Sequence, residues 1–171
     1  MIRKLRPPHR PLLRWRPGPV TYAAAQKAAQ GYAGYRYHPF PRCFVCGPQR
    51  VAGDGLCIFP GKVAASQKVA APWIPGADLS TGGETIEPEY AWAGLDCAGA
   101  FAAGIGPEKT LVLGQFTGAV KQPPKFGEHC VVMGWLIGID GRKHYSGTAV
   151  YNARGELCGL GRAVWIELNK P

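Results

Sequence analysis

The 171-residue chain contains no run of eighteen apolar residues. A membrane-spanning helix needs about 20 consecutive, predominantly apolar residues, so the sequence predicts no membrane span. Residues 1–19 also lack the continuous apolar core of a secretory signal peptide. We therefore expect a soluble, cytoplasmic protein.

Acidic residues are absent from the first 42 positions, which carry nine lysines and arginines. Residues 43–171 hold eleven basic and eleven acidic residues, so the net charge of +9 belongs to the N-terminal part of the chain. This asymmetry predicts a basic, Pro- and Arg-rich arm over residues 1–39 and a single domain over residues 40–171.

A basic arm of this kind either binds an anionic partner, such as nucleic acid or a membrane surface, or wraps the domain through its apolar residues. The sequence carries no nucleic-acid recognition motif beside the charge, so nucleic-acid binding is the less favoured interpretation. The apolar residues available for wrapping are Leu12, Leu13, Trp15, Val20 and Tyr22. A short helix is expected within the Ala-rich stretch 20–30.

Paired cysteines are scarce. Cys43 and Cys46 form the only C-x-x-C, and the other four are scattered at Cys57, Cys97, Cys130 and Cys158. A zinc site built on the pair would need a second ligand pair at close spacing, and the sequence offers none. Gly47-Pro48 follows the pair at once, which disfavours the helix that a redox motif would open. We therefore expect no metal site and no cofactor.

The most informative stretch that is present runs from Glu87 to Gly104, where nearly every residue is apolar or small. Pro88 suits a first helical position, and acidic neighbours suit the positive end of a helix dipole. The stretch predicts one central helix, buried on all sides, whose Gly94 and Gly99 allow close packing. Asp96 is the isolated charge in this apolar surround, and a buried carboxylate must find a partner, raise its pKa or face a cavity.

Strand patterns surround this helix. Two short strands are expected before it, and four long ones after it, with Asp140-Gly141 as a two-residue hairpin turn between two of them. The last three strands should form an antiparallel meander. The predicted strands cover residues 56–63, 68–74, 110–121, 128–139, 142–151 and 157–168. A curved antiparallel sheet wrapped around one helix is an α+β arrangement.

Two motifs resemble the hotdog superfamily, whose curved antiparallel sheet wraps one central helix. Cys43-Phe44-Val45-Cys46-Gly47-Pro48, followed by Gly55-Leu56, is similar to the C-F-x-C-G…G-L segment of hotdog thioesterases of the phenylacetyl-CoA type. Trp92-Ala93-Gly94-Leu95-Asp96 resembles the part of their helix that ends in Leu-x-Asp or Leu-Asp. The resemblance covers about residues 40–168 and implies the hotdog fold.

The resemblance also implies a function, acyl-CoA thioester hydrolysis, with Asp96 as nucleophile or general base. In that family a His-Gly-Gly segment begins the helix, and a backbone N–H there polarises the thioester carbonyl. Glu87-Pro88-Glu89 stands in that place here. Pro88 has no N–H to donate, so the amide of Glu89 is the candidate oxyanion donor.

The expected substrate is an acyl-CoA, whose nucleotide end needs basic partners. Arg142, Lys143 and His144 form the densest basic cluster outside the arm and are the candidate substrate-binding residues. An unpaired sheet edge predicts a homodimer or higher homo-oligomer. The alternative function is a non-catalytic acyl-CoA or lipid-binding hotdog protein, which the loss of His-Gly-Gly favours.

Overall fold

A computed structural model describes residues 16–169 of the chain. The described residues form three α-helices, two 3-10 helices and six strands. The helices are α1 (Tyr22–Ala29), η2 (Ala33–Tyr35), η3 (Ala77–Leu79), α2 (Pro88–Gly94) and α3 (Ala98–Ala102). The strands are β1 (Gly61–Lys62), β2 (Lys68–Trp73), β3 (Leu111–Val120), β4 (Cys130–Asp140), β5 (Lys143–Tyr151) and β6 (Leu157–Glu167).

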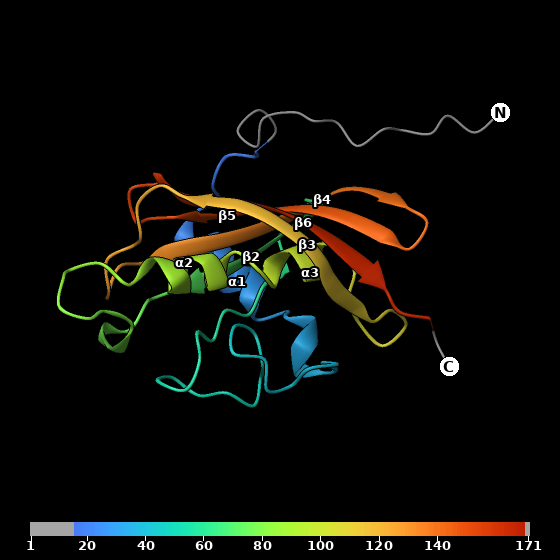
Figure 1. Cartoon of the computed structure of the whole chain (residues 1–171), viewed down its shortest axis with the longest axis horizontal. Helices are drawn as coiled ribbons and strands as arrows, with labels where there is room; N and C mark the ends of the chain where they lie inside the picture. The colour runs from blue at the N-terminus through green and yellow to red at the C-terminus, as the bar shows by residue number, and fades with distance from the viewer. Residues whose placement is uncertain (1–15, 170–171) are drawn as a thin grey trace.

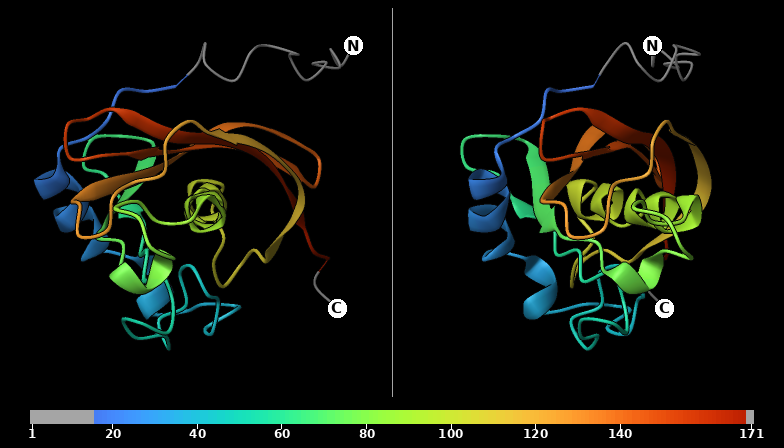
Figure 2. Two further views of the ribbon diagram at one scale, coloured as in Figure 1. Left: turned by 60° about the vertical axis from the view of Figure 1, so that its left-hand side comes forward. Right: turned by 90° about the vertical axis from the view of Figure 1, so that its left-hand side faces the viewer.

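The strands form a single antiparallel sheet in the order β1-β2-β4-β5-β6-β3. Strands β4, β5 and β6 are neighbours, so the predicted meander is confirmed, and Gly141 turns the β4–β5 hairpin with a positive φ of 56°. The sheet curves around α2 and α3, which the left-hand view of Figure 2 shows nearly end-on beneath the strands. The predicted α+β arrangement is confirmed.

The hydrophobic core fills both faces of the curved sheet. On the concave side, Val69 and Ala71 of β2 pack with Leu95 of the central segment. On the other side, Ala70 of β2 packs with Ala25 of α1. Alternate residues of β2 are therefore buried on opposite faces, because successive side chains of a strand point to opposite sides of the sheet.

The central helix is not continuous, which corrects the sequence prediction. Between α2 and α3, the amides of Leu95 and Asp96 donate to the carbonyls of Trp92 and Ala93, three residues back. These bonds tighten the chain into a turn of the 3-10 type in place of the α-helical pattern. Asp96 consequently lies in the break between two short helices. The segment is also open on one side, since the Trp92 side chain is 40% exposed.

Two glycines in this segment permit close packing, as predicted. A Cβ on Gly99 would overlap the Ser146 hydroxyl of β5, and a Cβ on Gly94 would lie 3.3 Å from the Trp73 ring of β2. Gly104 has a positive φ of 91° and follows α3 as the expected helix-ending residue. The position of the break is therefore held by contacts with the sheet on both of its sides.

The first predicted strand, residues 56–63, is reduced to the two residues of β1. The amides of Leu56 and Ile58 donate instead to the carbonyls of Phe44 and Val45, both at 2.8 Å. These bonds attach the C-x-x-C loop to the segment that precedes β1. Figure 1 shows this loop region on the side of α2 and α3 opposite to the sheet.

Helix α1 covers part of the outer face of the sheet. It confirms the predicted helix in the Ala-rich stretch, and the Thr21 side chain caps it by accepting a bond from the Ala24 amide. Val20 and Tyr22 pack against the core, so wrapping is confirmed for these two residues. The predicted wrapping residues Leu12, Leu13 and Trp15 lie outside the described part of the chain. The domain boundary at residue 39 stays a prediction.

Within residues 16–169, no helix is long and apolar enough to cross a membrane.

Candidate functional site

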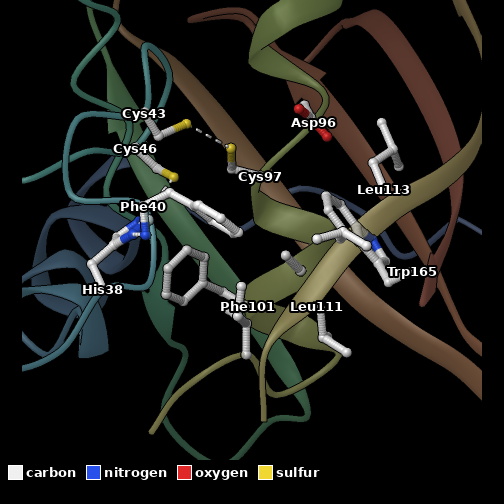
Figure 3. Close-up of a pocket in the computed structure, with 13 residues that line it drawn as sticks. His38, Phe40, Cys43, Cys46, Asp96, Cys97, Phe101, Leu111, Leu113 and Trp165 are labelled. Carbon is white, nitrogen blue, oxygen red and sulfur yellow. Dashed lines mark hydrogen bonds between the residues drawn. The ribbon is translucent and has the colours of Figure 1, made fainter. Parts of the chain in front are cut away.

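A cavity of about 360 Å³ lies beside the break between α2 and α3. Three segments enclose it: the loop around Phe40, the break with α3, and the start of β3 together with Trp165 of β6. Figure 3 shows Phe101 and Leu111 among its apolar lining. The polar groups in its lining are few: the Asp96 carboxylate, the His38 ring, the Trp165 indole N–H and three cysteine thiols. An apolar pocket with a few convergent polar groups is the usual form of a small-molecule site.

Asp96 is the carboxylate of this cavity, as the sequence analysis expected for a buried charge. Its Oδ1 is buried, and no hydrogen-bond partner for it occurs among the described residues. Burial, with a smaller contribution from the charge of Cys43, raises the pKa of Asp96 from its ordinary value to about 6. A carboxylate with these properties can accept a proton near neutral pH.

Three cysteine thiols converge next to Asp96. The Cys43 and Cys97 sulfurs lie 3.5 Å apart, and those of Cys43, Cys46 and Cys97 all lie within 4.8 Å of one another. Hydrogen bonds from the neighbouring thiols lower the pKa of Cys43, and the same arrangement raises the pKa of Cys97. The sequence argument against a zinc site overlooked Cys97, because it is 54 residues from Cys43 and no spacing rule joins them.

His38 also reaches this cluster, and the sequence analysis missed it. Its Nε2 lies 3.2 Å from the Cys46 sulfur, and its Nδ1 accepts a hydrogen bond of 2.9 Å from the Phe40 amide. The only signal available in the sequence was the nearness of His38 to the C-x-x-C. Phe101 and Trp165 were missed as cavity residues too, since they come from α3 and β6.

Glu89 lies apart from Asp96 within one chain. It is exposed in the first turn of α2, at the end of the helix away from the break. Seven helical residues span about 10 Å, so the Glu89 amide of the same chain is out of hydrogen-bond reach of a group bound at Asp96. The Glu87 carboxylate accepts bonds from the Thr81 amide and hydroxyl.

The predicted substrate-binding residues lie on the β4–β5 hairpin, and none of them lines the cavity that the described residues enclose. Arg142 and Lys143 are exposed. His144 is only 1% exposed, and its Nε2 lies 2.9 Å from a carboxylate oxygen of Glu167. The His144 side chain therefore faces inward, in hydrogen-bond contact with Glu167. A role for Arg142 and Lys143 in binding substrate stays a prediction.

Comparison with known proteins identifies the architecture. No protein-family model matches the sequence, and no curated protein matches it. Solved structures do match. The thioesterase-superfamily protein RHA08564 superposes with a TM-score of 0.61 over 71% of this chain and 58% of its own, at 17% identity. Thioesterase HI1161 from Haemophilus influenzae gives 0.60 over 71% of this chain and 85% of its own, at 14% identity.

The chain has the hotdog fold. The E. coli PaaI protein of the phenylacetic acid degradation operon has the same architecture, with a TM-score of 0.52, 13% identity, and coverage of 58% of this chain and 75% of its own. The predicted hotdog resemblance is confirmed. At these identities the likeness concerns the fold alone.

The two edges of this hotdog sheet differ. Edge strand β1 has two residues, and α1 packs beside it, where a Cβ on Gly61 would overlap the Ala28 carbonyl. Edge strand β3 has ten residues and contains neither a charged residue nor a proline. Charges, prolines and covering segments are the usual protections of an exposed edge, so β3 is the edge that can pair with another strand.

Proposed function

We propose that this protein hydrolyses acyl-CoA thioesters and that Asp96 is its catalytic carboxylate. The observation that carries the proposal is the unpartnered Asp96 oxygen in a cavity with mostly apolar walls. A structural carboxylate at this depth would be expected to hold a hydrogen-bond partner, because burying an unpaired polar group costs free energy. The hotdog fold shared with thioesterase-superfamily proteins is consistent with the same chemistry.

The reaction follows from the ionisation of Asp96. Above a pH of about 6 the carboxylate is charged and either attacks the thioester carbon or takes a proton from a water molecule that attacks it. The carbonyl oxygen gains negative charge in the tetrahedral intermediate. Collapse of the intermediate breaks the carbon–sulfur bond and releases the CoA thiolate. If water is the attacking group, the products are directly a carboxylic acid and free CoA. If Asp96 attacks, collapse leaves an acyl–Asp96 anhydride, and water then hydrolyses it to the carboxylic acid and restores the Asp96 carboxylate.

The developing oxyanion needs a donor, and the Glu89 amide of the same chain lies too far from Asp96 to serve. We assign this role to the Glu89 amide of a second subunit, since the first N–H groups of a helix lack intrahelical partners. Pairing of two β3 edges would make a symmetric dimer with its sites between subunits. Arg142 and Lys143 are then the proposed partners of the CoA phosphates, and the cytoplasm, where CoA esters occur, is the proposed location.

The dimer is tested by placing a charge on the β3 edge. Thr117 is exposed near the middle of β3, and Thr117→Lys should convert a dimer into monomers and remove hydrolysis together with the partner's amide. Light scattering at tens of micromolar measures the mass. Ala153→Lys, in the exposed turn between β5 and β6, adds the same charge away from the edge and should remain dimeric. A monomeric wild-type protein would contradict this arrangement.

Hydrolysis itself is tested with Asp96→Asn on a panel of short, long and aromatic acyl-CoA esters, with detection of the released thiol. The substitution keeps the shape of the side chain and should lower turnover by about 10²- to 10⁴-fold, the usual contribution of a general base. Asp140→Asn is the matched control, because Asn-Gly suits the β4–β5 hairpin as well as Asp-Gly does. Wild-type turnover that survives in Asp96→Asn would remove Asp96 from the mechanism.

The second candidate function is acyl-CoA binding without hydrolysis. The segment Glu87-Pro88-Glu89, in place of His-Gly-Gly, favours it, because Pro88 offers no N–H and the larger side chains crowd the approach to the backbone. This reading predicts acyl-CoA binding at the same cavity with no thiol release by the wild-type protein across the whole panel. Calorimetric titration with a non-hydrolysable thioether analogue measures this binding directly. It distinguishes a binding protein from one that does not bind acyl-CoA.

A further inference from the structure

The thiol cluster beside the cavity has the form of a metal site. We propose that Cys43, Cys46 and Cys97 bind one divalent ion of the zinc class through their three sulfur atoms. The inference is independent of thioester hydrolysis, since it depends only on the positions and chemistry of the thiols. Thiolate sulfur is a preferred ligand of zinc and other thiophilic ions.

The spacing of the sulfurs fits such an ion. Zinc–sulfur bonds of about 2.3 Å in a tetrahedral arrangement place neighbouring sulfurs about 3.8 Å apart. The Cys43 and Cys97 sulfurs lie 3.5 Å apart, and all three lie within 4.8 Å of one another. Figure 3 shows the sulfurs of Cys43, Cys46 and Cys97 turned toward one another from the loop and from the start of α3. An ion at their centre requires only small side-chain adjustments.

The backbone holds Cys43 and Cys46 in a chelating turn. The Gly47 amide donates to the Cys43 carbonyl at 2.9 Å, which closes the turn around the pair. A Cβ on Gly47 would lie 2.6 Å from both the amide nitrogen and the carbonyl oxygen of Cys43, so this tight turn accommodates only glycine. Two thiols fixed at C-x-x-C spacing are one half of many zinc sites. Cys97 adds the third ligand from another part of the fold.

The loop is also anchored to its surroundings on the side away from the cavity. The Tyr32 hydroxyl donates to the Cys46 carbonyl at 2.7 Å, and the Ile58 amide donates to the Val45 carbonyl. Cys97 precedes the first residue of α3, where Gly99 packs closely against the sheet. The C-x-x-C loop and the start of α3 are therefore both fixed before an ion binds. This lowers the loss of conformational entropy that binding the ion would otherwise cost.

His38 supports the thiols without serving as the fourth ligand. Because its Nδ1 accepts the Phe40 amide proton, the neutral ring carries its own proton on Nε2. The Nε2–H points to the Cys46 sulfur, which lies 3.2 Å from Nε2, and it would stabilise the thiolate that Cys46 becomes on binding the ion. Hydrogen bonds of this kind orient ligands and tune their affinity for a metal. The fourth position of the ion consequently opens on the cavity, which all three cysteines line beside Asp96.

The first measurement is metal binding by the full-length chain, reduced, stripped with a chelator and titrated with Co²⁺ and then with Zn²⁺. We expect one equivalent of Co²⁺ with the near-ultraviolet charge-transfer band and intense visible bands of tetrahedral thiolate coordination, displaced by one equivalent of Zn²⁺. Mass-spectrometric metal analysis of the protein purified without chelator should independently find zinc at one per chain. Absence of both signals would overturn the proposal.

Variants then assign the ligands. Cys43→Ser, Cys46→Ser and Cys97→Ser should each weaken binding more than about a hundredfold, and His38→Ala by about tenfold to a hundredfold, the usual effect of removing a group that supports a ligand. Cys57→Ser, a part-buried cysteine outside the cluster, should bind like the wild type. Full affinity in Cys97→Ser would overturn the three-thiolate site.

The competing outcome is a disulfide between Cys43 and Cys97. Thiol counting and peptide mapping of protein purified without reductant would reveal that bond, and a metal-free disulfide form that takes up no zinc after reduction would contradict the site. The Asp96→Asn variant should bind the metal as the wild type does. Loss of hydrolysis with retained metal, or the reverse, therefore separates the two proposals.

Discussion

Asp96 and His144 are both titratable side chains enclosed by the same curved sheet, but their surroundings differ. The His144 Nε2 lies 2.9 Å from the Glu167 carboxylate across the β5–β6 pair, whereas its Nδ1 has no partner among the described residues. The Asp96 Oδ1 meets no partner in the described part of the chain and lines a cavity. A polar group with a partner contributes to stability, whereas one held without a partner beside a hollow is available for a ligand. Asp96 differs from His144 in that it both lines the cavity and has a carboxylate oxygen without a partner, which supports the proposed role of Asp96.

The largest effect expected from this difference is on the pH dependence of hydrolysis. Only ionised Asp96 can act as base or nucleophile, and its pKa is raised to about 6 by burial. The value of kcat/KM should be constant above this pH and fall about tenfold per unit below it, to about a hundredth at pH 4. Initial rates between pH 4 and 8, with folding checked by circular dichroism at each pH, measure the profile. A midpoint near the ordinary pKa of 3.8 would show that Asp96 is solvated.

The next effect is on the free energy of unfolding. Substituting a buried polar residue usually destabilises a protein, whereas Asp96→Asn should stabilise this one. A folded-state pKa of about 6 against the ordinary 3.8 means that the folded protein favours protonated Asp96. Protonated Asp96 therefore adds to the free energy of unfolding below about pH 4. This stabilisation is lost as the pH rises to about 6, and it stays lost above that pH. In the metal-free protein Asp96→Asn removes the cost of burying the charge, and the change from 3.8 to about 6 corresponds to a stabilisation of about 3 kcal/mol at pH 8.

Thermal or urea unfolding of the wild type and Asp96→Asn at pH 8 and at pH 4 tests this directly. The difference between the two proteins should shrink toward pH 4, where Asp96 is protonated in the folded state. Destabilisation by Asp96→Asn at pH 8 would instead indicate that the carboxylate holds a structural hydrogen bond.

The smallest effect concerns the paired histidine. Glu167→Ala removes the partner of His144 and should cost about 1 kcal/mol, since Glu167 lies at the rim and water can take its place. Turnover per folded molecule and KM should not change, because neither residue lines the cavity among the positions the structure describes. Denaturant unfolding beside steady-state kinetics measures both. A raised KM would return His144 to the role of substrate-binding residue that its sequence position suggested.

The sequence predicted those features that depend on local pattern. The Asp140-Gly141 turn predicted the hairpin, the apolar stretch predicted the central segment, and the isolated charge of Asp96 predicted a buried carboxylate. The break next to Leu95 was not predictable, because it depends on packing of the two flanking glycines against Trp73 and Ser146.

Contacts between distant segments account for the other differences. The inward orientation of His144 depends on Glu167, which lies 23 residues away on β6. Likewise, the thiol cluster depends on Cys97, which only the folded chain brings to Cys43 and Cys46. Periodicity describes which face of an element is apolar, and it does not specify which residues of another element lie opposite.

The division of the central segment into α2 and α3 has a consequence for folding. Helices of seven and five residues are too short to persist alone, because isolated helices below about 12–15 residues are marginal in water. Strands β4, β5 and β6 are joined by short turns and can pair through contacts that are close in sequence. We therefore expect the meander to form first and to act as the surface on which α2 and α3 fold. Asp96, located between these helices, would then reach its native environment among the last parts of the chain.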